Sequence, residues 1–194
     1  MSTLITTTAQ IGTIKDAGGN NTAMTIDSTG VVTQPAKPRF HARRTGSAQS
    51  ASDNANTDAI FNTEDFDVGG TYNTSNGTYT VTHAGVYFIY TGITFTRDDT
   101  DIVDAAVGIL VNGSVVANTL ERYAANYIGQ THLSLSRLIS LSASDVVKVR
   151  VYANSQSNNN TNVVSHHPQG LQSNADFDTN GFASHFGGYM IWVH

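Results

Sequence analysis

The chain has 194 residues, contains no cysteine and carries a formal net charge of −5 at pH 7. This length suits one main domain with an appendage, and the lack of cysteine excludes a disulfide framework or a thiolate metal site. The negative charge argues against general affinity for nucleic acid. Only 13% of the residues are charged, while Asn, Thr, Ser and Gly are abundant, which is typical of extracellular or virion β proteins.

Neither end of the chain nor its interior shows a membrane or export signal. No apolar stretch approaches the roughly 18 residues of a membrane helix, and residues 1–6 lack the basic start and apolar run of a signal peptide. We therefore expect a protein that is made in the host cytoplasm, is not exported by the usual route and does not insert into a membrane.

Residues 1–38 are predicted to form an extended, β-rich N-terminal arm. Short strand-like pieces are separated by turn-forming runs at residues 16–21 and 27–30, and large apolar side chains are too few for a core. A core-poor arm becomes ordered by docking onto another structure. We predict an anchor or stalk, which ends at Pro35 and Pro38 in an extended linker. The expected anchoring side chains are Leu4, Ile5, Ile11 and Ile14.

Residues 39–194 carry repeated β signals bounded by Gly, Asn, Asp or Ser, without a long window of helical periodicity. Asn112 and Gly113 predict a two-residue hairpin turn, because Asn-Gly suits the positive φ angles of a type I′ turn. About ten short strands favour a sandwich or jelly roll. The expected strands are residues 40–43, 59–61, 71–72, 77–81, 85–95, 104–111, 114–120, 128–141, 145–153 and 183–193.

The run GTYTVTHAGVYFIYTGITF, residues 77–95, is interpreted as an aromatic β-hairpin hinged at residues 83–85. Because side chains alternate along a strand, Tyr87 faces opposite to Phe88 and Tyr90. Both faces then carry large apolar groups. We expect one face to pack inside the domain and the other to be covered by another subunit or by a loop.

Several pieces of the chain follow one another in a distinctive order. They are FHAR at 40–43, FN at 61–62, DVGGTY at 67–72, GTYTV at 77–81, GVYF at 85–88, ILVNG at 109–113, LSL at 133–135, LSASDVVKV at 141–149 and FASHFGGYMI at 182–191. This order resembles the globular head domain of complement C1q, which is related in fold to tumour necrosis factor. The resemblance covers residues 39–194.

The resemblance implies an all-β fold, a ten-stranded antiparallel jelly-roll sandwich at residues 39–194, which assembles as a homotrimer with aromatic residues of one sheet on the threefold axis. Burial of an otherwise exposed aromatic face would stabilise such an assembly by on the order of 25 cal/mol per Å² of apolar area. The trimer interface is expected to contain Tyr87, Tyr90, Phe88, Tyr189 and Phe186.

A second resemblance concerns the arm. The sequence before the head has no collagen-like repeat of glycine, and residues 25–33, TIDSTGVVT, resemble short β modules in fibre and structural proteins of tailed bacteriophages. The two resemblances imply a non-enzymatic bacteriophage virion protein that contacts other virion proteins through its arm. Its head would be a trimeric fibre tip, knob or capsid or tail surface decoration used in host attachment. A soluble carbohydrate-binding, lectin-like module and a cytokine-like ligand are the alternatives.

An aspartate-rich segment raises the question of a bound cation. Oxygen-rich loops of this kind hold Ca²⁺, although the spacing here lacks the Gly and final Glu of an EF-hand. Some complement-type heads bind Ca²⁺, so the resemblance implies a calcium site at Asp98, Asp99 and Asp101. A solvated acidic turn is the alternative, and no other cofactor is expected.

Residues 154–180 form a long polar run rich in Asn and Ser, and long loops in compact β proteins are usually functional or mobile. Amides can hydrogen-bond sugar hydroxyls, and Phe177 can supply a stacking face. We expect a recognition loop for a host cell-surface glycan, or alternatively a loop that wraps a neighbouring subunit. Its candidate contact residues are Asn158, Asn160, His166, His167 and Phe177.

Catalytic signatures do not occur in the sequence. We find no Gly-x-Ser-x-Gly turn, no phosphate-binding Gly-x-x-x-x-Gly-Lys-Ser/Thr loop and no His-Glu-x-x-His motif. The scattered histidines are interpreted as structural imidazoles; they are His41, His83, His132 and His185. An enzyme is therefore not expected.

Overall fold

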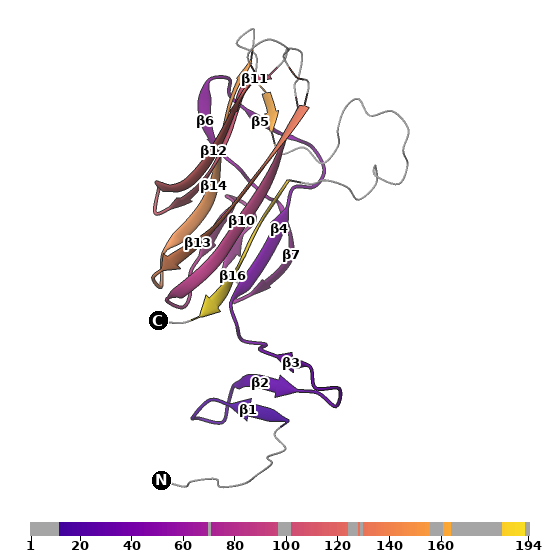
Figure 1. Ribbon diagram of the computed structural model, residues 1–194, viewed down its shortest axis with the longest axis vertical. Coiled ribbons are helices and arrows are strands. Elements are labelled where there is room, and N and C mark those ends of the chain that lie inside the picture. Colours follow the sequence, from indigo (N-terminus) through magenta and orange to yellow (C-terminus); the bar gives the residue numbers. More distant parts are fainter. Residues whose placement is uncertain are drawn as a thin grey trace. The chain divides into compact units, whose positions relative to one another are not determined.

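The computed structural model describes residues 12–69, 71–96, 102–123, 128, 130–155, 161–163 and 184–192, with only the backbone described for 161–163. The described residues form strands, turns and loops, and none of them lies in a helix that could span a membrane. The chain divides into two compact units, Met1–Lys37 and Pro38–His194 (Figure 1).

The first unit contains a small antiparallel sheet in the order β1-β2-β3, formed by β1 (Thr13–Lys15), β2 (Thr22–Ile26) and β3 (Val32–Thr33). Its turns follow from two aspartates. The Asp16 carboxylate accepts the backbone N–H of Asn20 at 2.9 Å, and the Asp27 carboxylate accepts those of Thr29 at 2.8 Å and Val31 at 2.9 Å. The bond from Thr29, two residues beyond Asp27, forms an Asx-turn, and the bonds from Asn20 and Val31 hold the longer loops closed.

The described part of this unit leaves its large aliphatic side chains accessible. Ile14, Ile26, Val31 and Val32 are all exposed. A single small sheet offers no second layer against which to pack them. Of the predicted anchor residues, Ile14 is therefore accessible for a contact, while Leu4, Ile5 and Ile11 lie outside the described residues.

The second unit is a sandwich of two antiparallel sheets. The first, called the β10 sheet, has seven strands in the order β5-β15-β10-β16-β4-β7, with β13 on the other side of β10. Its strands are β4 (Arg39–Arg43), β5 (Gln49–Ala51), β7 (Thr63–Val68), β10 (Gly85–Thr96), β13 (Gln130–Leu141), β15 (Thr161–Val163) and β16 (His185–Trp192).

The second, called the β14 sheet, has six strands in the order β12-β11-β14-β9-β8, with β6 also paired to β14. Its strands are β6 (Ala55–Asp58), β8 (Tyr72–Asn73), β9 (Thr78–Thr80), β11 (Ile102–Val111), β12 (Ser114–Arg122) and β14 (Val146–Ser155). The two sheets exceed the expected ten strands because β5, β6, β7 and β15 are short or polar and give no apolar alternation. The predicted all-β jelly-roll class is confirmed.

The core between the sheets is aromatic at its centre. The rings of Phe40 and Tyr79 stack at 4.0 Å, and Phe186 meets Phe40 edge to face at 4.8 Å. Tyr87 adds a fully buried ring whose hydroxyl donates to the carbonyl of His83 at 2.8 Å. Buried aromatic pairs of this geometry stabilise a core beyond their burial alone.

The Asn-Gly turn is confirmed. Asn112 and Gly113 have φ angles of 50° and 83°, and Val111 pairs with Ser114 across the turn. Both positive angles are those that a type I′ hairpin requires.

The predicted hairpin at residues 77–95 is wrong. β9 pairs with β8 and β14, whereas β10 pairs with β13, β15 and β16. The chain between them crosses from one sheet to the other, and Val81 still donates its N–H to the carbonyl of Asp145, the residue before β14, at 2.9 Å. Alternation fixes which way side chains face, but it does not determine which strand is the partner.

The strand expected at residues 59–61 is also wrong. Ala59 and Phe61 are buried as predicted, but they lie between β6 and β7 in irregular backbone. Ala59 sits against Gly77, where an added Cβ would come within 2.3 Å of the Ala59 carbonyl oxygen. The apolar residues of this segment are buried because they pack against a neighbouring turn, and they do not pair as a strand.

Candidate functional site

The outer face of the β10 sheet, which points away from the core, carries an aromatic patch. We define this patch as Phe66, Phe88, Tyr90, Leu138, Tyr189 and Trp192. Phe88 on β10 is paired with Leu138 on one side and with Tyr189 on the other. Paired residues point to the same face of a sheet, so these three side chains form one row. The rings of Phe88 and Tyr189 lie 5.5 Å apart.

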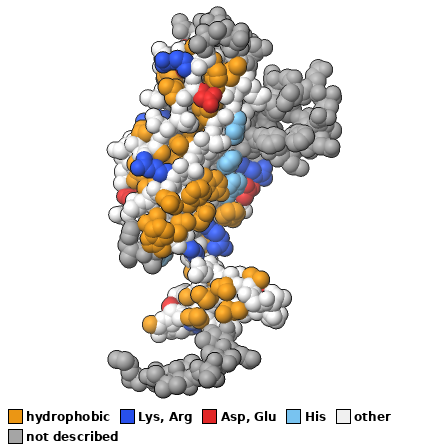
Figure 2. All heavy atoms as spheres, in the orientation of Figure 1, with side chains coloured by type: hydrophobic (Ala, Val, Ile, Leu, Met, Phe, Trp, Pro, Cys, Tyr) orange, Lys and Arg blue, Asp and Glu red, His pale blue; other side chains and the backbone are white. Residues whose placement is uncertain are grey.

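Much of this patch is open to solvent in the single chain. Leu138 is 55% exposed, Trp192 52% and Tyr189 44%. In Figure 2, hydrophobic side chains gather on the lower half of the second unit, on the face where β10, β13 and β16 lie in Figure 1. Monomeric proteins rarely leave a contiguous apolar surface of this kind uncovered.

Glycine at position 187 lets the patch lie flat on the sheet. An added Cβ at Gly187 would come within 2.5 Å of the Tyr90 hydroxyl oxygen and 2.6 Å of its ring carbon Cζ. The Tyr90 side chain therefore rests across β16 rather than standing upright. Partial burial in this position raises the pKa of Tyr90, because the phenolate would lose hydration.

A group of histidines adjoins the patch on the same face. We call His41, His132 and His185 the histidine cluster. The rings of His41 and His185 lie 5.7 Å apart, and Tyr90 lies 6.1 Å from His41 and 6.0 Å from His185. The cluster thus continues the aromatic surface with groups that can become charged.

Asp65 holds one end of the histidine cluster. Its carboxylate contacts Nδ1 of His41 at 2.8 Å and accepts a hydrogen bond from Nε of Arg43 at 2.7 Å. Partial burial tends to raise the pKa of Asp65, but the bonds from Arg43 and His41 outweigh this effect and lower it. The charge at this edge is therefore internally compensated.

A shallow groove of about 380 Å³ runs beside the patch. It forms because Ser134 and Ser136 of β13 are small, while the neighbouring β10 strand bears the large rings of Phe88 and Tyr90. The face is therefore uneven, and the groove can receive side chains of a second molecule.

Of the five residues predicted at a trimer interface, Phe88, Tyr90 and Tyr189 lie on this outer face. Tyr87 and Phe186 do not, and the prediction for them is corrected. Both are fully buried inside the chain, because alternation along β10 and β16 turns them inward. A side chain with no accessible surface cannot contact another copy.

Three members of the surface were not predicted from the sequence: Phe66, Leu138 and Trp192. Leu138 stands between outward serines of β13, so no apolar alternation marks it. Phe66 faces outward beside a bulge in the pairing of β4 and β7. Trp192 pairs with Val86 next to a second irregularity. Bulges displace side chains from the simple alternation that sequence reading relies on.

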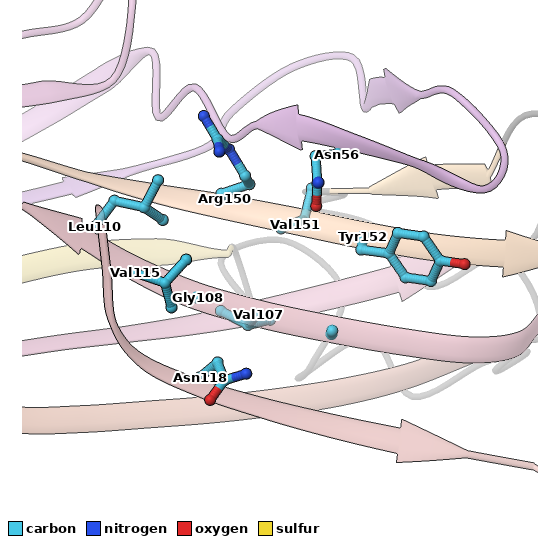
Figure 3. Close-up of a pocket in the computed structure, with 10 residues that line it drawn as sticks. Asn56, Val107, Gly108, Leu110, Val115, Asn118, Arg150, Val151 and Tyr152 are labelled. Carbon is cyan, nitrogen blue, oxygen red and sulfur yellow. The ribbon is translucent and has the colours of Figure 1, made fainter. Parts of the chain in front are cut away.

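A second surface feature lies on the outer face of the β14 sheet. It is a trough of about 110 Å³, whose floor is low because Ala106 and Gly108 of β11 are small. Figure 3 shows Leu110 and Val115 at one end and Tyr152 at the other. Asn56 and Asn118 lie on opposite sides of the floor, with Arg150 beside Leu110.

Hydrogen bonds fix the side chains along one wall of this trough. Arg150 donates from Nε to Asp58 at 2.9 Å, and Lys148 contacts the same carboxylate. The Tyr152 hydroxyl donates to Asn54 at 2.6 Å. Partial burial tends to raise the pKa of Asp58, but Lys148 and Arg150 outweigh it and lower the pKa.

The remaining predicted sites fall outside the described residues. These are the calcium candidates Asp98, Asp99 and Asp101, and the recognition-loop residues Asn158, Asn160, His166, His167 and Phe177. Within the described part of the chain, no group of three or more His, Asp or Glu side chains is arranged to hold a metal ion.

Comparison with known proteins assigns the second unit to a family. The model of the C1q domain matches residues 39–191. The globular domain of zebrafish complement 1qA protein is similar in structure, with a TM-score of 0.57, 13% identity, and coverage of 81% of this chain and 99% of that chain. Eiger, a TNF from S. frugiperda, gives a TM-score of 0.52 at 15% identity, covering 81% of this chain and 95% of that chain.

At these identities the structural likeness shows a shared fold and nothing more. No curated protein matches the sequence significantly. The resemblance of residues 25–33 to phage modules stays a prediction. The match to the family model spans most of the second unit, including every strand of its core. The chain therefore belongs to the C1q-domain family.

Proposed function

We propose that the chain is a homotrimeric structural protein, in which the outer face of the β10 sheet packs around a threefold axis. C1q and TNF-like domains commonly form homotrimers and are generally not enzymes. The observation that carries the proposal is the aromatic patch, of which Phe66, Leu138, Tyr189 and Trp192 are exposed in the single chain. Its burial between copies removes apolar surface from water, at about 25 cal/mol per Å².

Two exposed residues of equal accessibility test this proposal. Leu138 on the β10 sheet is 55% exposed, and Val115 on the β14 sheet is 56% exposed. We expect Leu138→Glu to convert the trimer to monomers in sedimentation velocity, because three carboxylates would be buried near the axis. Val115→Glu serves as the control and is expected to leave the assembly intact. Loss of assembly in both variants, or in neither, would contradict this choice of face.

The finer part of the proposal concerns the particle. We propose that the trimer is an appendage of a bacteriophage virion, anchored by residues 1–38 and displaying the head outward for host attachment. The N-terminal unit supports an anchoring role because Ile14, Ile26, Val31 and Val32 are exposed on a sheet with no second layer among the described residues. Such a surface is completed by docking onto another protein.

Removal of residues 1–37 tests the anchor. The second unit has its own core between two sheets, so the truncated head is expected to fold and assemble. It should fail to incorporate into particles, whereas the full chain should copurify with them and be visible on their surface by antibody labelling. Incorporation of the truncated head at the full-length level would refute the anchoring role.

A carbohydrate-binding role is the second candidate, and the trough on the β14 sheet favours it. Amide side chains on both sides, an aromatic ring at one end and aliphatic groups at the other form the mixed lining that binds sugars. The trough is far smaller than the roughly 300–1,000 Å³ of typical ligand pockets. A single sugar ring would bind weakly, and three copies would act together through avidity.

Saturation-transfer NMR with methyl glycosides of glucose, galactose, mannose and N-acetylglucosamine tests this role. Asn118→Ala should abolish any transfer, because Asn118 is exposed and contributes a hydrogen-bonding amide to the trough. Ser114→Ala, on the same strand but outside the lining, should not. Absence of transfer in the wild-type chain would eliminate the trough as a sugar site.

A further inference from the structure

The small sheet of the first unit has two unlike faces. Ile14 is paired with Met24, and Ile26 is paired with Val32. Paired residues share a face of a sheet, and so do Met24 and Ile26, which lie two positions apart on β2. These four side chains therefore form one apolar face, which we call the arm face and define as Ile14, Met24, Ile26 and Val32. Figure 2 shows hydrophobic side chains gathered on this unit.

The opposite face of the same sheet carries threonines. Thr13 is paired with Thr25, and Thr25 is paired with Thr33. The hydroxyls of Thr25 and Thr33 hydrogen-bond to each other. Hydroxyl groups also form hydrogen bonds with water, whereas aliphatic side chains form none. Covering the arm face therefore stabilises the sheet more than covering this threonine face does.

The arm face is open in the single chain. Ile14, Ile26 and Val32 are exposed, and Met24 is half-buried. The three strands contain only three, five and two residues. Strands this short need packing against a further layer to be stable. A contact at the arm face would therefore hold the sheet together as well as remove apolar surface from water.

The size of the arm face favours a partner that is already held nearby. Full burial of one Ile or Val side chain removes on the order of 100 Å² of apolar area from water, so the whole face offers about 400 Å². Separate proteins that associate stably contribute about 800 Å² each. A tethered partner is present at a millimolar effective concentration, and a face of this size is then sufficient.

The proposed trimer supplies such partners, because the arm leaves each head beside the aromatic patch. Arg39, the first residue of β4, is paired with Tyr189 of the patch. The carbonyl of Pro38 accepts the backbone N–H of Met190 at 3.0 Å. When Tyr189 lies near a threefold axis, all three arms therefore start close to that axis. Only residues 34–37 separate β3 from Pro38, and four residues span at most about 14 Å.

We propose that the arm faces of three copies pack against one another, so that the arms close into a three-chain stalk with an apolar centre. This inference rests on the proposed trimer. In the closed stalk, Ile14, Ile26 and Val32 of each copy face the other two copies, and the threonine face lies outside. The protein that completes each small sheet is then another copy of the same sheet. Contact with a particle uses the parts of the arm that remain outside, including the threonine face.

Cysteine cross-linking tests the proposal, because the chain contains no cysteine of its own. A bis-maleimide with a short spacer is added to the full-length variant Val32→Cys at neutral pH. We expect covalent dimers in a denaturing gel, because the three copies of position 32 face one another. Thr33→Cys is the matched control, since Thr33 is exposed on the same strand but lies on the threonine face. It should stay largely monomeric in the gel.

Hydrogen exchange measures the same contact without a reagent. The backbone amides of residues 22–26 should exchange slowly in the full-length trimer, and about tenfold or more faster in Ile14→Asp, because a carboxylate at the arm face opens the stalk. Thr13→Asp is the control, since Thr13 is the neighbouring residue on the opposite face, and it should keep the slow exchange. Exchange in the head should be the same in both variants.

The variant Leu138→Glu separates this inference from the proposed trimer. In its monomeric heads the arms are no longer tethered, so the Val32→Cys cross-link and the slow exchange should both disappear. Slow exchange that persists in the Leu138→Glu monomer would mean that another part of the same chain covers the arm face, and a cross-link that persists would mean that the arms associate without the head. Either result would overturn the inference.

The remaining outcomes are also decisive. Equal cross-linking of Val32→Cys and Thr33→Cys would show that the arms are close without a preferred face, and would overturn the inference. A wild-type chain that is trimeric in sedimentation velocity, with no cross-link in Val32→Cys, would overturn the stalk and leave the head trimer intact. A wild-type chain that is monomeric would overturn the proposed trimer and this inference together.

Discussion

The two sheets of the head present opposite kinds of outer face. On the β14 sheet the strands carry ion pairs across the face, with Asp58 held by Lys148 and Arg150, and Asp104 held by Arg122 at 2.8 Å. On the β10 sheet the central strands carry rings and serines, and the described ion pairs lie at the β4–β7 edge. Charged pairs of this kind are compatible with water, whereas exposed rings favour a partner.

The difference does not come from strand alternation, since both sheets alternate in the same way. It comes from what occupies the outward positions. Charged side chains at these positions are hydrated, so a sheet that carries them can face solvent. Aromatic side chains at these positions leave apolar surface exposed in the single chain. The character of the outward positions, rather than the fold itself, therefore determines which sheet is the candidate for association.

The largest expected effect separates the inside of the β10 sheet from its outside. Phe186 is fully buried and Tyr189, three residues along the same strand, is 44% exposed. Phe186→Ala should lower the free energy of unfolding by about 3–5 kcal/mol, because it opens a cavity in the core. Tyr189→Ala should change it by less than about 1 kcal/mol in the monomer while weakening assembly. Urea unfolding and sedimentation measure the two effects.

Similar losses of unfolding free energy for the two variants would show that Tyr189 belongs to the protomer core. The outer face would then not be an association surface distinct from the core.

A second comparison uses one glycine from each outer face. An added Cβ at Gly187 would press within 2.5 Å of Tyr90, whereas at Gly108 the nearest heavy atom is 3.5 Å away. Gly187→Ala should therefore displace the Tyr90 ring and weaken trimer formation by about tenfold or more. Gly108→Ala should leave assembly unchanged, because its methyl group fits into the trough. Analytical ultracentrifugation over a concentration series distinguishes them, and equal behaviour would mean that the position of Tyr90 does not matter.

The smallest expected effect concerns the ion pairs of the β14 sheet. Asp58→Asn should lower the free energy of unfolding by on the order of 1 kcal/mol or less at neutral pH, since the groups are partly exposed. The pKa of Asp58 is lowered in the folded chain, so this contribution is present above the unfolded value of about 3.9 and is lost as the pH falls below it.

Urea unfolding of the wild type and Asp58→Asn at neutral and at acidic pH checks this sign. The gap between the two chains should close in acid. A gap that widened in acid would mean that protonated Asp58, rather than the carboxylate, makes the stabilising contact.

Much of the fold could be predicted because its long strands carry clear signals. Alternation in β10, β11 and β14 located these strands to within a few residues, and Asn-Gly at residues 112–113 gave the turn. The pairing of β9 with β10 was wrong because partner choice depends on contacts distant in sequence. The strands β5, β6, β7 and β15 were missed because short or polar segments carry no apolar period.

The candidate surface was predictable only in part, for a related reason. Alternation establishes that Tyr87 and Tyr90 face opposite ways, but only the packing of the second sheet shows which of them is inside. Phe186 was placed on the wrong face for the same reason. The approach of His41 to His185 depends on the register between β4 and β16, which no local pattern in the sequence contains.

The central claim is that the outer face of the β10 sheet is buried between three copies of the chain. Sedimentation equilibrium of the intact chain at neutral pH tests it most directly, combined with solvent accessibility of Trp192 measured by fluorescence quenching. We expect a single species of three times the chain mass, with Trp192 shielded and then exposed again in Leu138→Glu. A stable monomer with Trp192 fully accessible would contradict it.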